Sequence, residues 1–378
     1  MTGPARLTWT EDGQPRSALW RSEAGVPPPA RVQVADERIK ADTAYRLVCE
    51  GTALLWRGDF HNARQILQAL ARRIERKPPR PGPLGTAAEA FHLHRKAQGE
   101  RSRLLGRLLL PLEPGHRIPL RRAPDVQQAA LEAWGASDEP CVASLRELLG
   151  LIGAHEWRKK GVEIPVLGAR IHPHYGVFSP VRGEYVDLVQ QAPLPPGCDL
   201  AFDVGTGTGV LAAVLARRGV ARVLATDQDP RALACARDNL QRLGLQARVD
   251  VLQADLFPPG RAALVVCNPP WVPARPNAPL EHAVYDPDSR MLRGFLGGLA
   301  AHLAPGGEGW LILSDLAEHL GLRTRDELLA AIAAGGLEVA GRSDIRPRHP
   351  RVADAADPLH AARAAEVTSL WRLVARRG

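Results

Sequence analysis

The feature that most constrains the fold is a glycine-rich turn between a short apolar strand and an apolar helix. The strand is expected over residues 200–204, the turn reads Gly205-Thr206-Gly207-Thr208-Gly209, and the helix begins near Val210. Glycine is required where the backbone turns with a positive φ or passes close to a ligand. The turn therefore predicts an α/β domain with a ligand site at the end of this strand.

The C-terminal half as a whole supports the α/β class, because strand-like and helix-like runs alternate along it. Such alternation predicts a parallel sheet with crossover helices. The tail over residues 366–376 is also strand-like, and we expect it to add a final edge strand. The other strands are expected over residues 222–226, 248–252, 263–267 and 309–314, and the helices over 210–218, 230–243, 289–303 and 324–334.

Two acidic residues indicate which ligand the turn binds. Asp227 ends the next expected strand, where a carboxylate can accept both hydrogen bonds of a ribose diol. Asp203 precedes the glycines and suits a ligand with a cationic end, whereas it would repel a pyrophosphate. The Gly-x-Gly-x-Gly spacing also differs from the Gly-x-Gly-x-x-Gly of dinucleotide sites. These features favour S-adenosylmethionine over NAD, with a purely structural glycine-rich connection as the remaining alternative.

The most informative stretch is Asn268-Pro269-Pro270-Trp271, directly after an expected buried strand. Its two prolines fix φ and remove two N–H donors, which leaves the Asn268 side-chain oxygen and the Pro269 carbonyl as rigid acceptors. Such acceptors would orient a conjugated, weakly nucleophilic nitrogen and stabilise the positive charge that develops on it. Trp271 can stack on a planar base or carboxamide. We predict that these four residues are catalytic; the alternative is a proline-rich turn after an edge strand.

Together these motifs resemble those of class I S-adenosylmethionine-dependent methyltransferases, over about residues 160–378. The resemblance implies a Rossmann-like seven-stranded sheet with an antiparallel last strand and the cofactor across the strand ends. The Asn-Pro-Pro-aromatic motif is similar to that of adenine exocyclic-amine methyltransferases and of release-factor glutamine methyltransferases, which most often have Tyr at the position of Trp271. The cofactor contacts implied are Phe178, Asp203, Gly205, Thr206, Gly207, Gly209, Asp227, Gln228, Asp255, Leu256 and Asn268.

An upstream segment, Pro180-Val181-Arg182-Gly183-Glu184, resembles the entry segment of the glutamine methyltransferases, with Gly183 in place of a proline. The resemblance implies that Phe178 covers the cofactor and that Glu184 contacts its methionyl end. A structural loop between two domains is the alternative. His172 and His174 lie close by, but they have no third ligand in the sequence nearby, so we expect no metal site.

The N-terminal part is expected to differ from the rest in structure and charge. We expect a flexible arm over residues 1–41, a helical basic domain that recruits the substrate over 42–160, and the methyltransferase domain over 161–378. Residues 61–122 hold 14 Lys and Arg against 4 Asp and Glu, a net charge of +10 in a chain of +8. This segment indicates a polyanion or an acidic partner, or else only a solvated helix face. The residues expected to meet phosphates are Arg72, Arg73, Arg76, Lys77, Arg95, Lys96, Arg101, Arg103 and Arg107.

Composition sets the remaining limits. No apolar run reaches the ~20 residues of a bilayer span, no signal sequence opens the chain, and five scattered cysteines favour neither disulfides nor zinc, so we expect a cytoplasmic protein. The first hypothesis is an N-methyltransferase acting on a planar amino or amide nitrogen of a macromolecule, with RNA of the translation apparatus placed first. The alternatives are a protein glutamine methyltransferase acting on a translation-related protein, and a non-catalytic S-adenosylmethionine- or RNA-binding module.

Overall fold

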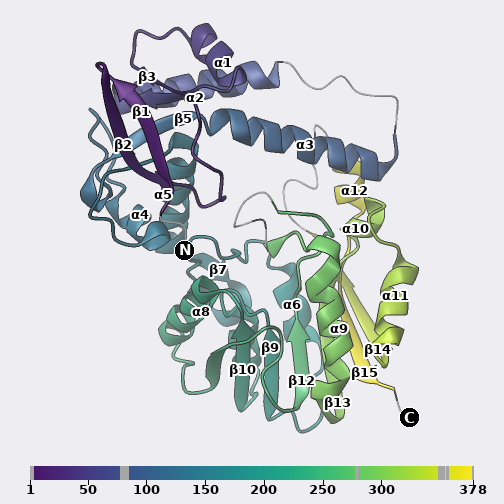
Figure 1. Ribbon diagram of the computed structural model, residues 1–378. Coiled ribbons are helices and arrows are strands. Elements are labelled where there is room, and N and C mark those ends of the chain that lie inside the picture. Colours follow the sequence, from purple (N-terminus) through teal and green to yellow (C-terminus); the bar gives the residue numbers. More distant parts are fainter. Residues whose placement is uncertain are drawn as a thin grey trace. The chain divides into compact units, whose positions relative to one another are not determined.

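The computed structural model describes residues 4–76, 85–276, 281, 283–347, 354 and 357–376. These divide into an N-terminal unit, from residues 1–84 and 92–156, and a C-terminal unit, from residues 85–91 and 157–378. Figure 1 labels many of the elements of both units. Within the described ranges, no helix has both the length and the apolar character needed to cross a membrane.

The N-terminal unit is built on a six-stranded mixed sheet with the order β1-β2-β6-β5-β4-β3. β1 and β2 form an antiparallel hairpin, and β3, β4 and β5 run parallel to one another. Its strands are β1 (Arg6–Glu11), β2 (Gln14–Arg21), β3 (Val32–Ala35), β4 (Ala53–Trp56), β5 (Leu108–Leu112) and β6 (Cys141–Ser144). Its helices are α1 (Ala41–Cys49), α2 (Phe60–Glu75), α4 (Gln127–Trp134) and the 3-10 turn η1 (Pro114–His116). Most of α3 (Ala87–Leu105) and of α5 (Leu145–Lys160) also belongs to this unit.

This sheet shows that one sequence-based prediction is wrong and that another is incomplete. The expected flexible arm over residues 1–41 contains β1, β2 and β3. Residues 42–160 are mostly helical, as expected, but they also contain the short strands β4, β5 and β6. Asp12 and Gly13 both have positive φ, 51° and 72°, and close the first hairpin, so the Asp-Gly pair was a hairpin signal. β4, β5 and β6 are fully buried runs of four or five residues, which periodicity cannot distinguish from helix.

The C-terminal unit contains a seven-stranded sheet with the order β11-β10-β9-β12-β13-β15-β14. The first five of these strands are parallel, and β15 is antiparallel to both of its neighbours. The tail is thus a strand, but it lies inside the sheet, and β14 forms the edge instead. The bounds are β9 (Leu200–Val204), β10 (Arg222–Asp227), β11 (Val249–Gln253), β12 (Ala262–Cys267), β13 (Leu303–Ser314), β14 (Leu337–Ile345) and β15 (Thr368–Ala375).

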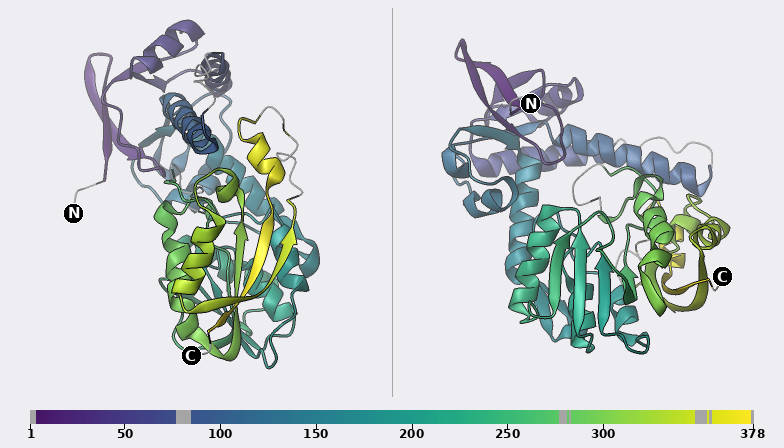
Figure 2. Two further views of the ribbon diagram at one scale, coloured as in Figure 1. Left: turned by 90° about the vertical axis from the view of Figure 1, so that its right-hand side faces the viewer. Right: turned by 60° about the horizontal axis from the view of Figure 1, so that its bottom comes forward.

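Helices cover both faces of this sheet, as Figure 2 shows. One face packs on α6 (Glu184–Gln191), α7 (Val210–Arg217) and α8 (Pro230–Arg242), and the other on α9 (Arg290–His302) and α11 (Arg325–Ala334). The remaining elements are β7 (Val162–Ile164), η2 (Pro165–Leu167), β8 (Ala169–Ile171), η4 (Pro287–Ser289), α10 (Leu316–His319) and α12 (His360–Ala365). Because β9, β10, β12 and β13 are parallel, their carboxyl ends share one edge, and the expected site residues follow these ends.

Candidate active site

The glycine turn after β9 has the conformation that its sequence predicts. Gly205, Gly207 and Gly209 have φ values of 73°, 55° and 80°, in the left-handed region that favours glycine. A Cβ on Gly207 would meet no atom within 4 Å, so a ligand can approach the backbone there. A Cβ on Gly205 would lie 2.4 Å from Cε of Met291, so this methionine covers one side of the turn.

Asp203 lies beneath this turn and not on its surface. Its Oδ2 accepts hydrogen bonds from Oγ1 of Thr206 at 2.6 Å and from the backbone N–H of Ala212 at 3.0 Å, and the residue is 1% exposed. Burial raises the pKa of Asp203 to about 6, and the nearby charge of Asp227 adds to the shift. This carboxylate thus holds the turn itself, and its expected contact with a cationic ligand stays a prediction.

Asp227, at the end of β10, faces the turn. Its Oδ2 accepts the N–H of Gly207 at 3.0 Å, and its Oδ1 accepts the N–H of Asp229 at 3.0 Å. Burial raises the pKa of this half-buried carboxyl. Gln228 beside it is exposed, and its carbonyl accepts Nε2 of Gln253 at 3.3 Å. The acid expected to bind a ribose thus lies against the open backbone of the glycine turn.

Asp255 and Leu256 follow β11 and have different surroundings. Asp255 is exposed and forms an ion pair with Arg290 at 3.4 Å. Leu256 has a φ of 76°, and its carbonyl accepts Oγ1 of Thr226 at 2.5 Å. This bond joins the segment after β11 to the end of β10.

Asn268 follows β12 and is held by its own motif. Its side-chain Oδ1 accepts the indole N–H of Trp271 at 2.9 Å, and Pro269 between them is buried. A carboxamide oxygen has two lone pairs, so one acceptor position remains for a substrate. The Arg182 guanidinium carbon lies 5.3 Å from the centroid of the Trp271 ring, so part of the expected stacking surface is occupied.

Three carboxylates surround the end of β12. Burial raises the pKa of the Cys267 thiol, and the charges of Asp203, Asp286 and Asp227 raise it further. Asp286 is buried and accepts the N–H groups of Met291 at 2.9 Å and Leu292 at 3.2 Å, at the start of α9. The edge of the sheet is therefore anionic, which suits a cationic ligand.

Asp286 and Met291 both contribute to this edge, although neither was predicted from the sequence. An acid shortly before a helical pattern is a helix-start signal that could have identified Asp286. No sequence signal places the Met291 side chain over Gly205, because that contact depends on the packing of α9.

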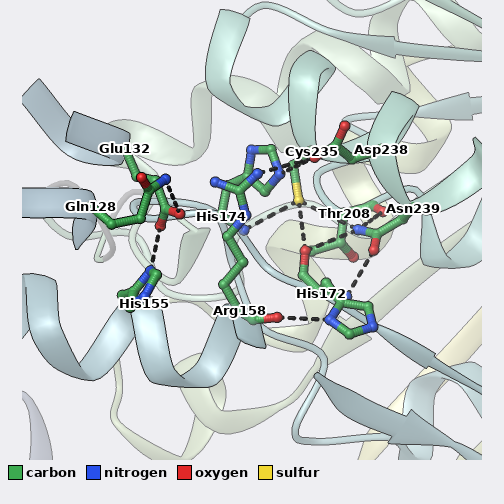
Figure 3. A network of polar contacts seen from close by, with 10 residues as sticks. All are labelled: Gln128, Glu132, His155, Arg158, His172, His174, Thr208, Cys235, Asp238 and Asn239. Atoms are coloured by element: carbon green, nitrogen blue, oxygen red, sulfur yellow. Dashed lines mark hydrogen bonds and ion pairs between the residues drawn. The ribbon is translucent and has the colours of Figure 1, made fainter. Parts of the chain in front are cut away.

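The upstream residues lie mostly in structural contacts. Phe178 is half-buried against the core on the α7 side, and Glu184 accepts Nε of Arg182 at 3.2 Å. His172 Nδ1 bonds to the carbonyl of Arg158 at 2.7 Å, and His174 Nε2 pairs with Asp238 at 2.9 Å (Figure 3). In the described part of the chain, no group of three or more metal-ligating side chains comes together.

Many of the basic residues that were expected to meet phosphates have partners within the chain. Arg73 pairs with Asp42 at 2.8 Å, and Arg101 pairs with Glu75 at 2.7 Å. Arg107 donates to the carbonyl of Val48 at 2.5 Å, and burial lowers its pKa. Arg103 lies 3.7 Å from Glu100, and Arg95 has an interaction as well. Lys77 lies outside the described residues.

A second group of arginines on α2 is different. Arg64, Arg72 and Arg76 are exposed and four or eight residues apart, which puts them on one side of the helix. Within the described residues, none of their three side chains has a hydrogen bond or ion pair. They form the α2 arginine row.

Comparison with known proteins agrees with this geometry. Residues 169–324 match the family model of the Methyltransferase small domain. A release factor glutamine methyltransferase of Cereibacter sphaeroides is 36% identical over 33% of this chain and 50% of its own length. A ribosomal protein L11 methyltransferase of Pelotomaculum thermopropionicum is 37% identical over 38% of this chain and 39% of its own length. The chain thus spans half or less of the length of each of these two relatives.

A solved ribosomal protein L11 methylase from Lactobacillus delbrueckii subsp. bulgaricus aligns at 18% identity, with a TM-score of 0.35, over 52% of this chain and 79% of its own length. A score this low carries no weight, so the fold rests on the strand order given above. Residues 169–324 are thus similar to methyltransferases, and the seven-stranded sheet with an antiparallel last strand is the one that the resemblance implies. The predicted α/β fold class is confirmed.

Asp203→Asn should change how stability depends on pH. The folded-state pKa of about 6 lies above the ordinary value of 3.8, so the stabilisation from this group is complete below pH 3.8 and is lost as the pH rises through 6. The Asn side chain does not ionise, so the variant does not lose this stabilisation as the pH rises. We expect the free energy of unfolding of the variant, relative to that of wild type, to increase by about 2–3 kcal/mol from pH 4 to pH 7.5.

Urea unfolding at a series of pH values measures this difference. Glu338→Gln, which removes one exposed carboxylate from β14, is the control and should follow the wild-type curve. A constant difference between Asp203→Asn and wild type across the series would refute the raised pKa.

Proposed function

We propose that this protein is an S-adenosylmethionine-dependent N-methyltransferase. The observation that carries the proposal is one edge of one sheet, where an open glycine turn, the Asp227 carboxylate and the Asn268 acceptor follow neighbouring strands. The anionic surroundings of this edge suit a sulfonium cofactor and disfavour the pyrophosphate of a dinucleotide. A non-catalytic binding module would have no use for the acceptor at Asn268.

The residues present fit the cofactor. The backbone at Gly207 is open to a ligand, and each Asp227 oxygen keeps acceptor capacity for a ribose hydroxyl beside its bond to the chain. When bound, S-adenosylmethionine supplies an activated methyl group. Phe178, Gln228, Asp255 and Leu256 stay proposed contacts, with Leu256 the most fixed of them through Thr226.

The chain's contribution to the transfer is orientation and charge stabilisation. The free lone pair of Asn268 Oδ1 and the Pro269 carbonyl accept the N–H groups of the substrate nitrogen and point its lone pair at the methyl group. These oxygens also stabilise the positive charge that grows on the nitrogen. No general base is needed before the transfer, because the extra proton can leave afterwards.

For the substrate we propose a side-chain amide of a translation-related protein. The relatives are named for a release factor and for ribosomal protein L11, both of them proteins. Arg182 covers part of the Trp271 ring, which leaves less surface for a nucleobase than for a slim carboxamide. Pairing within the chain also occupies much of the basic segment. Such a substrate implies action in the cytoplasm.

Transfer of a tritiated methyl group from S-adenosylmethionine into lysate fractions tests the function. We expect label in material that protease digests and nuclease leaves intact. Asn268→Ala should lower the transfer rate by about 10²–10³ with little change in cofactor affinity, the scale of losing one preorganised polar group. The proposal would be contradicted if Asn268→Ala transferred the methyl group at the wild-type rate, or if no lysate fraction became labelled.

Asp227→Ala tests the cofactor site directly. Loss of a charge-assisted pair of hydrogen bonds should weaken S-adenosylmethionine binding by about 1.5–3 kcal/mol in calorimetry. The control is Asp250→Ala, which removes a carboxylate paired with Arg222 at the opposite end of β10. Equal affinities for both folded variants and wild type would rule out Asp227 as the ribose ligand.

RNA remains a second candidate substrate because of the α2 arginine row. If Arg64, Arg72 and Arg76 meet phosphates, replacing all three by Gln should flatten the log–log salt dependence of RNA binding by about 2 units, at about 0.7 per phosphate on a single strand. Replacing the largely paired set Arg101, Arg103 and Arg107 should change that slope much less. A wild-type slope near zero would exclude RNA and leave the protein substrate.

A further inference from the structure

Arg182 is fixed by two buried carboxylates from distant parts of the chain. Its Nε donates to Oε1 of Glu184 at 3.2 Å, and its Nη2 donates to Oε1 of Glu366 at 3.0 Å. Glu184 is 6% exposed and Glu366 is 3% exposed. Oγ of Ser314 also donates to Oε1 of Glu366, at 2.7 Å. Charge-assisted bonds in such burial leave the guanidinium little freedom to move.

The elements that carry these groups meet at the edge of the sheet that carries the site. Ser314 ends β13 and is paired in register with Thr368, the first residue of β15, while Glu366 lies just before that strand. Glu184 is the first residue of α6, which packs near β15. Arg182 is therefore held at the carboxyl end of β13, next to the segment that follows β12.

From this position Arg182 reaches Asn268 through Trp271. Its guanidinium carbon lies 5.3 Å from the centroid of the Trp271 ring, within the range of a cation–π contact. The edge of the same ring donates its Nε1–H to Oδ1 of Asn268 at 2.9 Å. Trp271 also packs against apolar clusters on both faces of the sheet. The contacts run without a break from Ser314 through Glu366, Arg182 and Trp271 to Asn268.

We propose that Arg182 is a positioning residue for the transfer, acting through Trp271 on the carboxamide of Asn268. A carboxamide can turn by 180° and present its NH₂ in place of its oxygen. A donor facing the N–H groups of the substrate would repel them, so the transfer requires the oxygen to face the substrate. The indole N–H defines where Oδ1 lies, and the covered ring face keeps the indole in place. The inference rests on the proposed function and assigns Arg182 and Trp271 within it.

Trp271 is suited to this task in a way that Phe is not. A phenyl ring would keep the packing and the cation–π contact but has no N–H for Asn268. Trp271→Phe therefore removes the link between the ring and the amide and leaves Arg182 in place. Arg182→Gln removes the other link, and Arg182→Lys keeps the charge without the fork that bridges Glu184 and Glu366.

The first test compares rates. Arg182→Gln and Trp271→Phe should each lower kcat 10-fold to 100-fold and leave the cofactor Kd within 2-fold, and Arg182→Lys should recover part of the rate. The double variant should be no slower than Trp271→Phe, because both changes break one pathway. The control Arg342→Gln removes a guanidinium that lies 4.9 Å from the Trp371 centroid and pairs with Asp344, and it should turn over like wild type.

The second test needs no activity. The chain has four asparagines, so ¹⁵N-asparagine labelling gives only four side-chain amide pairs, and Asn268→Ala identifies the relevant one. The Asn268 pair should shift in Arg182→Gln and in Trp271→Phe, and not in Arg342→Gln. If Arg182→Gln does not fold, Arg182→Lys and Trp271→Phe supply the same comparison.

Three results would overturn the proposal: an unchanged kcat for Arg182→Gln, losses that multiply in the double variant, or a raised KM for the macromolecular substrate with kcat intact. The last would make Arg182 a direct substrate contact. If the wild-type protein transfers no methyl group at all, the proposed function fails. The positioning of Asn268 by Arg182 is then tested only by the ¹⁵N signals. An Asn268 amide pair that does not shift in Arg182→Gln would overturn that positioning.

Discussion

The hydrogen bond from the Gly207 N–H to the Asp227 carboxylate is the contact on which the site depends. It joins the turn after β9 to the end of β10 at 3.0 Å, while Asp203 holds the same turn from beneath through Thr206 and Ala212. Glycine at position 207 permits both the positive φ and the open backbone. This turn thus supplies a fixed backbone surface with the Asp227 carboxylate beside it. A nucleoside with a short polar tail can lie against such a backbone and bind the carboxylate through its ribose.

Negative charge gathers at this edge at a cost in stability. Asp203, Asp227 and Asp286 all have a pKa raised chiefly by burial, and each is compensated by N–H or hydroxyl donors from the turn or from the start of α9. Carboxylates that are buried and have no ion pair with the described residues are typical of functional sites. A sulfonium ligand would supply the missing positive charge, so the electrostatics and the proposed chemistry agree.

The sequence predicts the central strands of the C-terminal unit, but it predicts neither β14 nor the sheet of the N-terminal unit. Segments of alternating strand-like and helix-like pattern, bounded by turn residues, predict β9 to β13 and the helices between them. The prediction succeeds there because the hydrophobic periodicity and the positions of the turn residues agree. In the N-terminal unit, the run Leu54-Leu55-Trp56 is too short for its period to be read, and it proved to be β4. Within the site, glycine and acid positions follow from local chemistry. The Trp271–Asn268 bond and the Arg182 contacts depend on tertiary packing that no local pattern encodes.

The central claim is that this edge binds an adenosyl sulfonium-type ligand and not a dinucleotide. Calorimetric titration of the full chain with S-adenosylmethionine and, separately, with NAD tests it most directly, because neither ligand requires knowledge of the methyl acceptor. We expect one site for S-adenosylmethionine and no measurable heat with NAD. Binding of NAD in preference, or no binding of S-adenosylmethionine by the folded protein, would contradict it.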